Sequence, residues 1–364
     1  MKKKILIVTG IIIVIIVAML AWSYFTVKPD AFKVAEFIKQ HPDKAAIYII
    51  RNDTVLASQN ADSIMPLAST VKTIVAIEFA RQAAAGIINF KTLIDTLELD
   101  KYFLPGTDGG AHKNWLNQMR EDSLFVGSKV KILDVAKGMV RYSSNANTEY
   151  LMDLLGFDNL NAQLDSLGLK GHHKLYPFIS SLVVCAKPKG EDIKPFTEKL
   201  DKMPMDEYIR KSFEVHEKLK HDPSVKANFD GASIYIDQQK IWSNRLPGGS
   251  PKQYASIMKK INSRTYFDTT QQIIIDAIFE WPMIDIDIAA KFKHRGMKGG
   301  STAFVLTQAL YATDDDNNKT VIAVFFNNLY TLQSLELRSS CDEFNKKVLN
   351  DADFRTKLTE LFKP

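Results

Sequence analysis

The stretch Ser69-Thr70-Val71-Lys72 stands where the apolar pattern of the chain changes from strand to helix. Before it, two β-rich runs flank the turn-forming pair Asn52-Asp53, which predicts a hairpin over residues 45–57. After it, apolar residues recur at helical spacing as far as Gly86, a typical helix C-cap residue. A serine three residues before a lysine on a starting helix places both side chains on one face, one turn apart.

This pair predicts an activated serine nucleophile. A serine hydroxyl attacks a carbonyl poorly until a base takes its proton. Lys72 can be that base only if burial or a neighbouring cation lowers its pKa from about 10.4 toward neutrality. The same spacing recurs at Ser128 and at Ser256, which we interpret as a helix cap and as a small residue packed within a helix. Ser69 differs because free backbone N–H groups at a helix start can stabilise an oxyanion.

Two further motifs carry candidate groups. Ser143-Ser144-Asn145 lies between two helical patterns, where a hydroxyl can relay protons and a carboxamide can bind a substrate amide. Taken alone, it is more simply a polar turn that caps the next helix. Lys298-Gly299-Gly300 opens an expected strand over residues 301–312. A lysine there can bind a carboxylate and lower the pKa of a nearby lysine, and glycines let a substrate approach the backbone.

The order and setting of the three motifs resemble class A β-lactamases and their penicillin-binding relatives, over roughly residues 31 to 364 outside a charged insertion. The resemblance implies that Ser69 is acylated, that Lys72 helps to activate it and that Ser143 carries protons. It also implies an oxyanion hole formed by the backbone N–H groups of Ser69 and Ser301. The substrate-binding residues that it implies are Asn145, Lys298, Gly300, Ser301 and Thr302.

The order of the predicted elements indicates an α+β fold. Strands near both ends of the chain would form one antiparallel sheet flanked by helices, as in the β-lactamase-like fold, with an all-helical subdomain between them. We expect the catalytic domain over residues 30–364. Its sheet subdomain would comprise residues 30–68 and 290–364. The helical subdomain would span residues 69–289, with a charged insertion at about 187–230.

The sequence departs from the class A pattern in two places. Class A enzymes use a glutamate on a loop after the second motif to activate the deacylating water. The matching loop here, residues 172–179, contains no glutamate. His172 or His173 could replace this base, although paired histidines in a loop more often have no catalytic role. In addition, Gly299 stands where a hydroxyl residue is usual, which removes one donor to the substrate carboxylate.

Residues 5–25 contain no charged side chain and follow three lysines. Their length and flanks predict an uncleaved transmembrane signal-anchor, with residues 1–4 in the cytoplasm and the catalytic domain periplasmic or otherwise extracytoplasmic. A cleaved signal peptide is the alternative. In that compartment, Cys185 and Cys341 could pair, although two separate buried thiols are an equally good interpretation.

The composition excludes some function classes. The net charge is +5, and three of the positive charges are at residues 2–4, so no nucleic-acid-binding face is predicted. No metal-ligand spacing and no phosphate-binding loop is present, so we expect no metal and no cofactor.

Three functions stay open from the sequence. The first is hydrolysis of a β-lactam or of a related amide or ester through an acyl-enzyme. The second is a penicillin-binding D-alanyl carboxypeptidase or a slowly deacylating sensor. The third is an inactive extracytoplasmic binding module, which the filled catalytic motifs disfavour.

Overall fold

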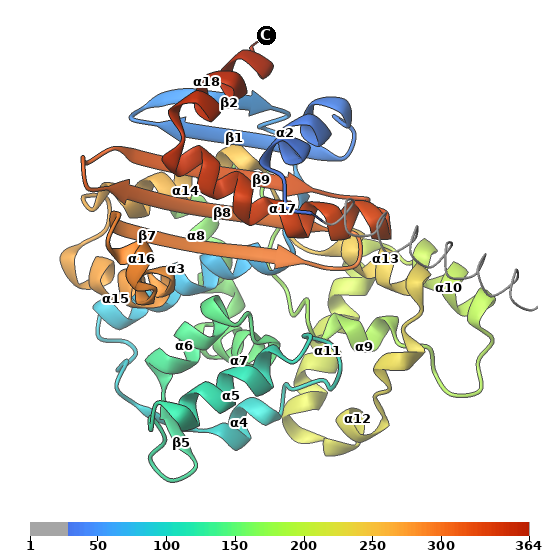
Figure 1. Ribbon diagram of the computed structural model, residues 1–364. Helices are drawn as coiled ribbons and strands as arrows, with labels where there is room; N and C mark the ends of the chain where they lie inside the picture. Colours follow the sequence, from blue (N-terminus) through green and yellow to red (C-terminus); the bar gives the residue numbers. More distant parts are fainter. Residues whose placement is uncertain (1–27, 364) are drawn as a thin grey trace, which may run out of the picture.

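The structure is a computed structural model that describes residues 28–363. Its centre is a five-stranded antiparallel sheet with the order β2-β1-β9-β8-β7 (Figure 1). The N-terminal hairpin pairs along β9 near the C-terminus, as the sequence predicts for an α+β fold of this class. The strands of this sheet are β1 (Ala45–Arg51), β2 (Thr54–Gln59), β7 (Phe292–Ser301), β8 (Leu306–Asp314) and β9 (Lys319–Phe326).

Successive side chains of the strands pack into two separate hydrophobic cores. In β9, Val321, Ala323 and Phe325 belong to one apolar cluster. Ile322 and Val324, between them, belong to the other. This division follows from the two-residue period of a strand, which points successive side chains to opposite faces. The sheet is therefore covered by helices on both faces.

Helices from the two ends of the chain cover one face of the sheet, and helices from its middle cover the other (Figure 1). The first face carries α2 (Ala31–Gln40), α17 (Thr331–Asn350) and α18 (Ala352–Leu361). On the other face, α14 (Pro251–Ser263) packs against β1, β8 and β9. Its start has Pro251 in the first turn and a capping box between Ser250 and Gln253. The boundaries of the two proposed subdomains stay a prediction.

The remaining helices lie mainly beneath the sheet in the view of Figure 1. Those of the first part are α3 (Lys72–Ala84), α4 (Thr96–Asp100), α5 (Ala111–Glu121), α6 (Ile132–Arg141), α7 (Asn145–Leu155) and α8 (Phe157–Ser166). Those that follow are α9 (Ser181–Cys185), α10 (Ile193–Lys202), α11 (Met205–His221), α12 (Pro223–Asn228), α13 (Ile236–Arg245), α15 (Thr269–Phe279) and α16 (Ile286–Ala289). The charged insertion is thus built from α10, α11 and α12.

The strand predicted to begin near Ser301 is divided in the structure. Lys298 lies toward the end of β7, and β8 begins only at Leu306. The turn between them is fixed by Thr302, whose Oγ1 accepts hydrogen bonds from the N–H groups of Phe304 and Val305. The sequence pattern did not predict β7 as a strand. Its polar residues and three glycines interrupt the alternation of apolar and polar residues that normally indicates one.

The predicted localisation needs correction. Within residues 28–363, none of the helices has the length and apolar character to cross a membrane. The segment 5–25, on which the single N-terminal transmembrane helix was predicted, lies outside the described residues. The membrane anchor is therefore not supported. The two cysteines, for which pairing was left open, are both free and buried.

β7 is held unusually close to the short 3-10 helix η1 (Ala68–Val71). A Cβ atom at Gly300 would lie 2.5 Å from the backbone nitrogen of Ser69 and 2.6 Å from the carbonyl oxygen of Leu67. Thr307 of β8 fastens the same helix, since its Oγ1 donates to the Leu67 carbonyl over 2.7 Å and lies 2.8 Å from Thr70 Oγ1. Glycine is therefore required at position 300.

Gly300→Ala should lower the free energy of unfolding by about 1–3 kcal/mol, because backbone atoms in the way of the new methyl group cannot move aside alone. Gly299→Ala is the matched control. A Cβ atom at Gly299 would meet nothing closer than the Thr307 carbonyl oxygen at 3.5 Å. Denaturant unfolding measures both effects, and equal destabilisation by the two substitutions would contradict the close contact.

Candidate active site

Ser69 lies at the tip of the helix that the sequence predicted. The two-residue strand β3 (Met65–Pro66) pairs with β6 (Gly248–Gly249) and leads into η1, which continues into α3. Ala68 has a φ of +45°, a region that costs a non-glycine residue free energy. Such strain is typical of functional sites, where the surrounding structure enforces it. Here it turns the chain so that Ser69 is half-buried at a pocket.

Lys72, the first residue of α3, is completely buried. Its Nζ donates to the carbonyl oxygen of Ser143 over 2.7 Å and to Asn145 Oδ1 over 3.0 Å. It also lies 3.4 Å from Ser143 Oγ. The first two motifs, more than seventy residues apart, are thus joined by one ammonium group.

Lys298 reaches the same hydroxyl from the sheet. Its Nζ donates to Ser143 Oγ over 3.0 Å and to the Gly299 carbonyl over 2.7 Å. Ser143 has a φ of +68°, which aims its side chain between the two lysines. Its neighbour Ser144 acts as the N-cap of α7, accepting from the N–H of Asn147. The polar turn therefore both caps a helix and supplies a hydroxyl to the site.

Burial sets the charge of the two amines. It lowers the pKa of Lys72 well below its ordinary value, and the charge of Lys298 lowers it further. Two carboxylates, Asp108 and Glu149, act in the opposite direction on Lys72. Burial also lowers the pKa of Lys298 to about 7. A neutral lysine is therefore accessible near neutral pH, and a neutral amine can accept a proton from a serine.

A pocket of about 500 Å³ opens above these groups, between the sheet and the helices. Its floor includes Ser69, Ser143 and Asn145. Lys72 and Lys298 lie beneath this floor and are not part of the lining. The other residues that line the pocket are Ala68, Thr107, Asp108, Gly109, Phe178, Ile179, Trp242, Leu246, Gly299, Gly300, Ser301, Thr302, Ala303, Leu306, Thr307, Gln308 and Arg338.

The remaining residues predicted to bind substrate lie around this pocket. Asn145, Gly300, Ser301 and Thr302 all line it. The Thr302 hydroxyl is engaged within its own turn and lies 2.8 Å from Ser243 Oγ. Ser301, at the exposed end of β7, is the more open of the two hydroxyl residues.

The two alternative serine-lysine pairs lie elsewhere. Ser128 is exposed in a turn and donates to Asp95 Oδ2 over 2.6 Å. Ser256 lies within α14, and its partner Lys259 forms an ion pair with Asp53 on the surface. Neither serine lines the pocket.

The loop histidines weighed as alternative bases do not line the pocket either. His172 is buried, which lowers its pKa to about 4. Its Nδ1 lies 2.7 Å from the His173 carbonyl oxygen, and its Nε2 lies 3.2 Å from the Tyr254 hydroxyl. His173 packs against Gly248 of β6. Both histidines support the loop that precedes Phe178 and Ile179.

The sequence did not reveal Arg338, Asp108 or Glu149 as residues of the site. Arg338 comes from α17, far along the chain, and nothing in its neighbourhood distinguishes it from other surface arginines. Asp108 lies in a glycine-rich loop just before a helix, where the sequence pattern suggests an ordinary turn or capping residue. Glu149 did leave a signal, because it follows Asn145 by four residues and therefore shares its face of the helix.

A family model described as the beta-lactamase enzyme family matches residues 31–272. None of the curated protein sequences compared with the chain matches it. Among solved structures, a β-lactamase from Sphaerobacter thermophilus is similar at 18% identity and a TM-score of 0.53, over 94% of this chain and 99% of that one.

Two further solved structures have the same fold. A point mutant of PBP-A, in an acyl-enzyme complex with penicillin G, is 15% identical with a TM-score of 0.51, over 88% of this chain and 96% of that one. A β-lactamase from Chitinophaga pinensis is 14% identical with a TM-score of 0.50, over 87% and 98%. The family match covers well over half of the chain, which therefore belongs to the beta-lactamase enzyme family and is a serine hydrolase with the β-lactamase-like fold.

Proposed function

We propose that this enzyme transfers an acyl group from a β-lactam, or from a related D-alanyl amide or ester, to Ser69 and then releases it slowly to water. The observation that carries the proposal is the meeting of two buried lysines at Ser143 Oγ, directly below the pocket that Ser69 lines. A site with a serine, a poised amine and a relaying hydroxyl has the groups that acyl transfer requires.

In the proposed acylation, neutral Lys72 takes the proton of the Ser69 hydroxyl, and the Ser69 oxygen bonds to the substrate carbonyl carbon. The carbonyl oxygen gains a negative charge, which the N–H groups of Ser69 and Ser301 would stabilise. When the carbon–nitrogen bond breaks, Ser143 donates its proton to the leaving nitrogen. Lys72, which lies within 3.4 Å of Ser143 Oγ, returns the proton to Ser143.

Substrate recognition would use the amide of Asn145 and the charges of Lys298 and Arg338. Asn145 presents its amide to the pocket while Lys72 holds its oxygen. Lys298 would favour a substrate carboxylate through its charge from below the floor. Arg338 lines the pocket and anchors its guanidinium to the Thr302 carbonyl over 2.6 Å, which leaves further N–H donors for a carboxylate.

We expect slow release because one side of the pocket lacks a general base. This side is formed by the loop after His173. Phe178 and Ile179 line it there, and neither can activate a water molecule. Asp108 is the carboxylate among the lining residues, and it accepts hydrogen bonds from the N–H groups of Gly110 and His112 at the start of α5. A missing general base typically costs a factor of 10² to 10⁴ in rate. This observation favours the penicillin-binding type over a fast β-lactamase.

A fluorescent penicillin should label the folded protein, and the label should persist. Ser69→Ala should abolish the labelling, because the acylated oxygen is gone. Ser128→Ala and Ser256→Ala are the matched controls and should label like the wild type. Gel fluorescence and intact mass measure the outcome. Labelling that survives Ser69→Ala would refute the assignment of the nucleophile.

Ile179→Glu should speed deacylation at least about tenfold, because it places a carboxylate at the side of the pocket that lacks a base. Ile179→Gln is the control of matching size and should not speed it. The measurement is the decay of the penicilloyl adduct by mass spectrometry. A wild-type adduct that decays within seconds would show that another group already serves as the base.

Arg338→Gln should slow acylation by a penicillin about tenfold or more, since a hydrogen bond to a charged group contributes about 1.5–3 kcal/mol. The methyl ester of the same penicillin lacks the carboxylate and should be affected much less. Second-order labelling rates with both compounds make the comparison. An equal loss for acid and ester would rule out a direct contact between Arg338 and the carboxylate.

A further inference from the structure

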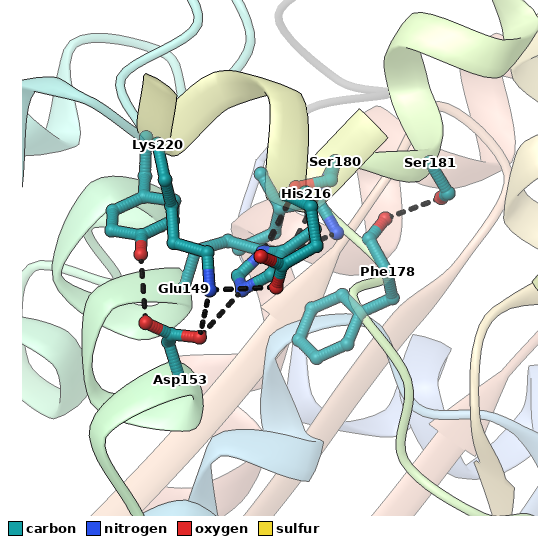
Figure 2. A network of polar contacts seen from close by, with 10 residues as sticks. Glu149, Asp153, Phe178, Ser180, Ser181, His216 and Lys220 are labelled. Carbon is teal, nitrogen blue, oxygen red and sulfur yellow. Dashed lines mark hydrogen bonds and ion pairs between the residues drawn. The ribbon is translucent and has the colours of Figure 1, made fainter. Parts of the chain in front are cut away.

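Glu149 of α7 holds the pocket-lining segment that follows His173 (Figure 2). Its Oε1 accepts from the N–H of Ile179 over 2.8 Å and from that of Ser180 over 3.1 Å. Its Oε2 accepts from the Ser180 hydroxyl over 3.0 Å. The carboxylate is completely buried, and these three hydrogen bonds fix the backbone next to Phe178 and Ile179.

His216 brings the charged insertion into this network. It comes from α11, is completely buried, and lies with Nδ1 2.7 Å from Glu149 Oε2. Its Nε2 lies 3.1 Å from Oδ1 of Asp153, one turn further along α7. Both ring nitrogens therefore face carboxylates, an arrangement that is satisfied only when both carry protons.

Other charged and polar groups surround the imidazole ring. Asp153 also accepts from Lys220 of α11 over 2.8 Å and from the Tyr102 hydroxyl over 3.0 Å. Tyr102 stacks on the ring with 5.1 Å between the centroids. The carboxylates of Asp153 and Glu217 approach His216 as metal ligands would, but Lys220 already bridges them and lies 2.6 Å from Glu217. The cluster is therefore an ion-pair network rather than a metal site.

Burial alone would lower the pKa of His216. The hydrogen bonds to Asp153 and Glu149 outweigh burial and raise its pKa to about 9. The ring is thus a cation at neutral pH. Because the folded value lies above the ordinary 6.5, its contribution to stability is complete below about pH 6.5 and is lost as the pH rises through about 9.

The network also reaches the catalytic amine. Glu149 is one of two carboxylates whose charge favours the protonated form of Lys72. Asn145, which accepts a hydrogen bond from Lys72, lies one turn before Glu149 on α7. A protonated imidazole 2.7 Å from Glu149 balances that charge. Anything that removes this cation should leave Lys72 protonated to a higher pH.

We propose that His216 is a positioning residue for the acylation of Ser69: as a buried cation supplied by the inserted helix α11, it balances Glu149 and keeps it bound to the pocket-lining segment. This inference rests on the proposed function, because it concerns the rate of the acylation step. It gives the insertion a task in the reaction without placing any of its residues against the substrate. The pocket segment, the catalytic lysine and the insertion would then form one electrostatic unit.

The test is the rate of acylation by a fluorescent penicillin as a function of pH. In the wild type, the rate should rise with pH as Lys72 loses its proton. His216→Gln should move the midpoint of this rise upward by about half a pH unit or more, because the charge of Glu149 is no longer balanced. His221→Gln, an exposed histidine at the end of the same helix, is the matched control and should keep the wild-type midpoint.

A double variant separates charge balance from loss of packing. Glu149→Gln with His216→Gln removes both charges, so the midpoint should return toward that of the wild type. A purely structural role for His216 would lower the rate at every pH, leave the midpoint where it was, and give no recovery in the double variant. That result would overturn the proposal.

Folding of each variant is checked by circular dichroism. If His216→Gln does not fold, His216→Asn takes its place, because it removes the same cation with a smaller side chain. The midpoint should again rise, and an unchanged midpoint would overturn the inference. Wild-type protein that folds but is never labelled would instead refute the proposed function itself, so the two failures are distinguishable.

Discussion

The site depends on two buried amines that share one hydroxyl. Removing an ammonium group from water costs several kcal/mol, and two of them within reach of one oxygen also repel each other. Hydrogen bonds from Lys72 and Lys298 partly offset this cost. Their acceptors are the two oxygen atoms of Ser143, the side chain of Asn145 and the Gly299 carbonyl. The repulsion that remains makes it easier for Lys72 to give up its proton. In the proposed mechanism, this contact is costly for the fold and would prepare Lys72 as the base.

The surrounding backbone enforces this arrangement. Ala68 and Ser143 both have positive φ angles, which few non-glycine residues adopt, and both line the pocket. Each is held by structure on both sides: Ala68 between β3 and the contact with Gly300, and Ser143 between α6 and the capped start of α7. The sheet and the helices together therefore hold these two backbone conformations in place. The three motifs that meet at the site accordingly come from distant parts of the chain.

The sequence predicted the parts of this design that follow from local pattern. The strand-to-helix change at Ser69, the capping serine beside Ser143 and the sheet formed from both ends of the chain all leave regular signals. Residues whose position depends on tertiary packing left none. Arg338 reaches the pocket because α17 brings it to the turn that follows β7, where it donates to the Thr302 carbonyl. His216 is buried because α11 packs against α9 and places the ring beside Glu149 and Asp153 of α7. An arginine or histidine on an amphipathic helix is otherwise typical of a solvent-exposed position.

Charge explains how the helix α7 can contact both Lys72 and the pocket-lining segment that contains Ile179. One turn of α7 separates Asn145, which contacts Lys72, from Glu149, which holds Ile179. A lone buried carboxylate so close to the base would keep Lys72 protonated and would itself be costly. A cation between Glu149 and Asp153 removes both problems at once. In the proposed mechanism, the need to neutralise this carboxylate would tie the insertion to the active site.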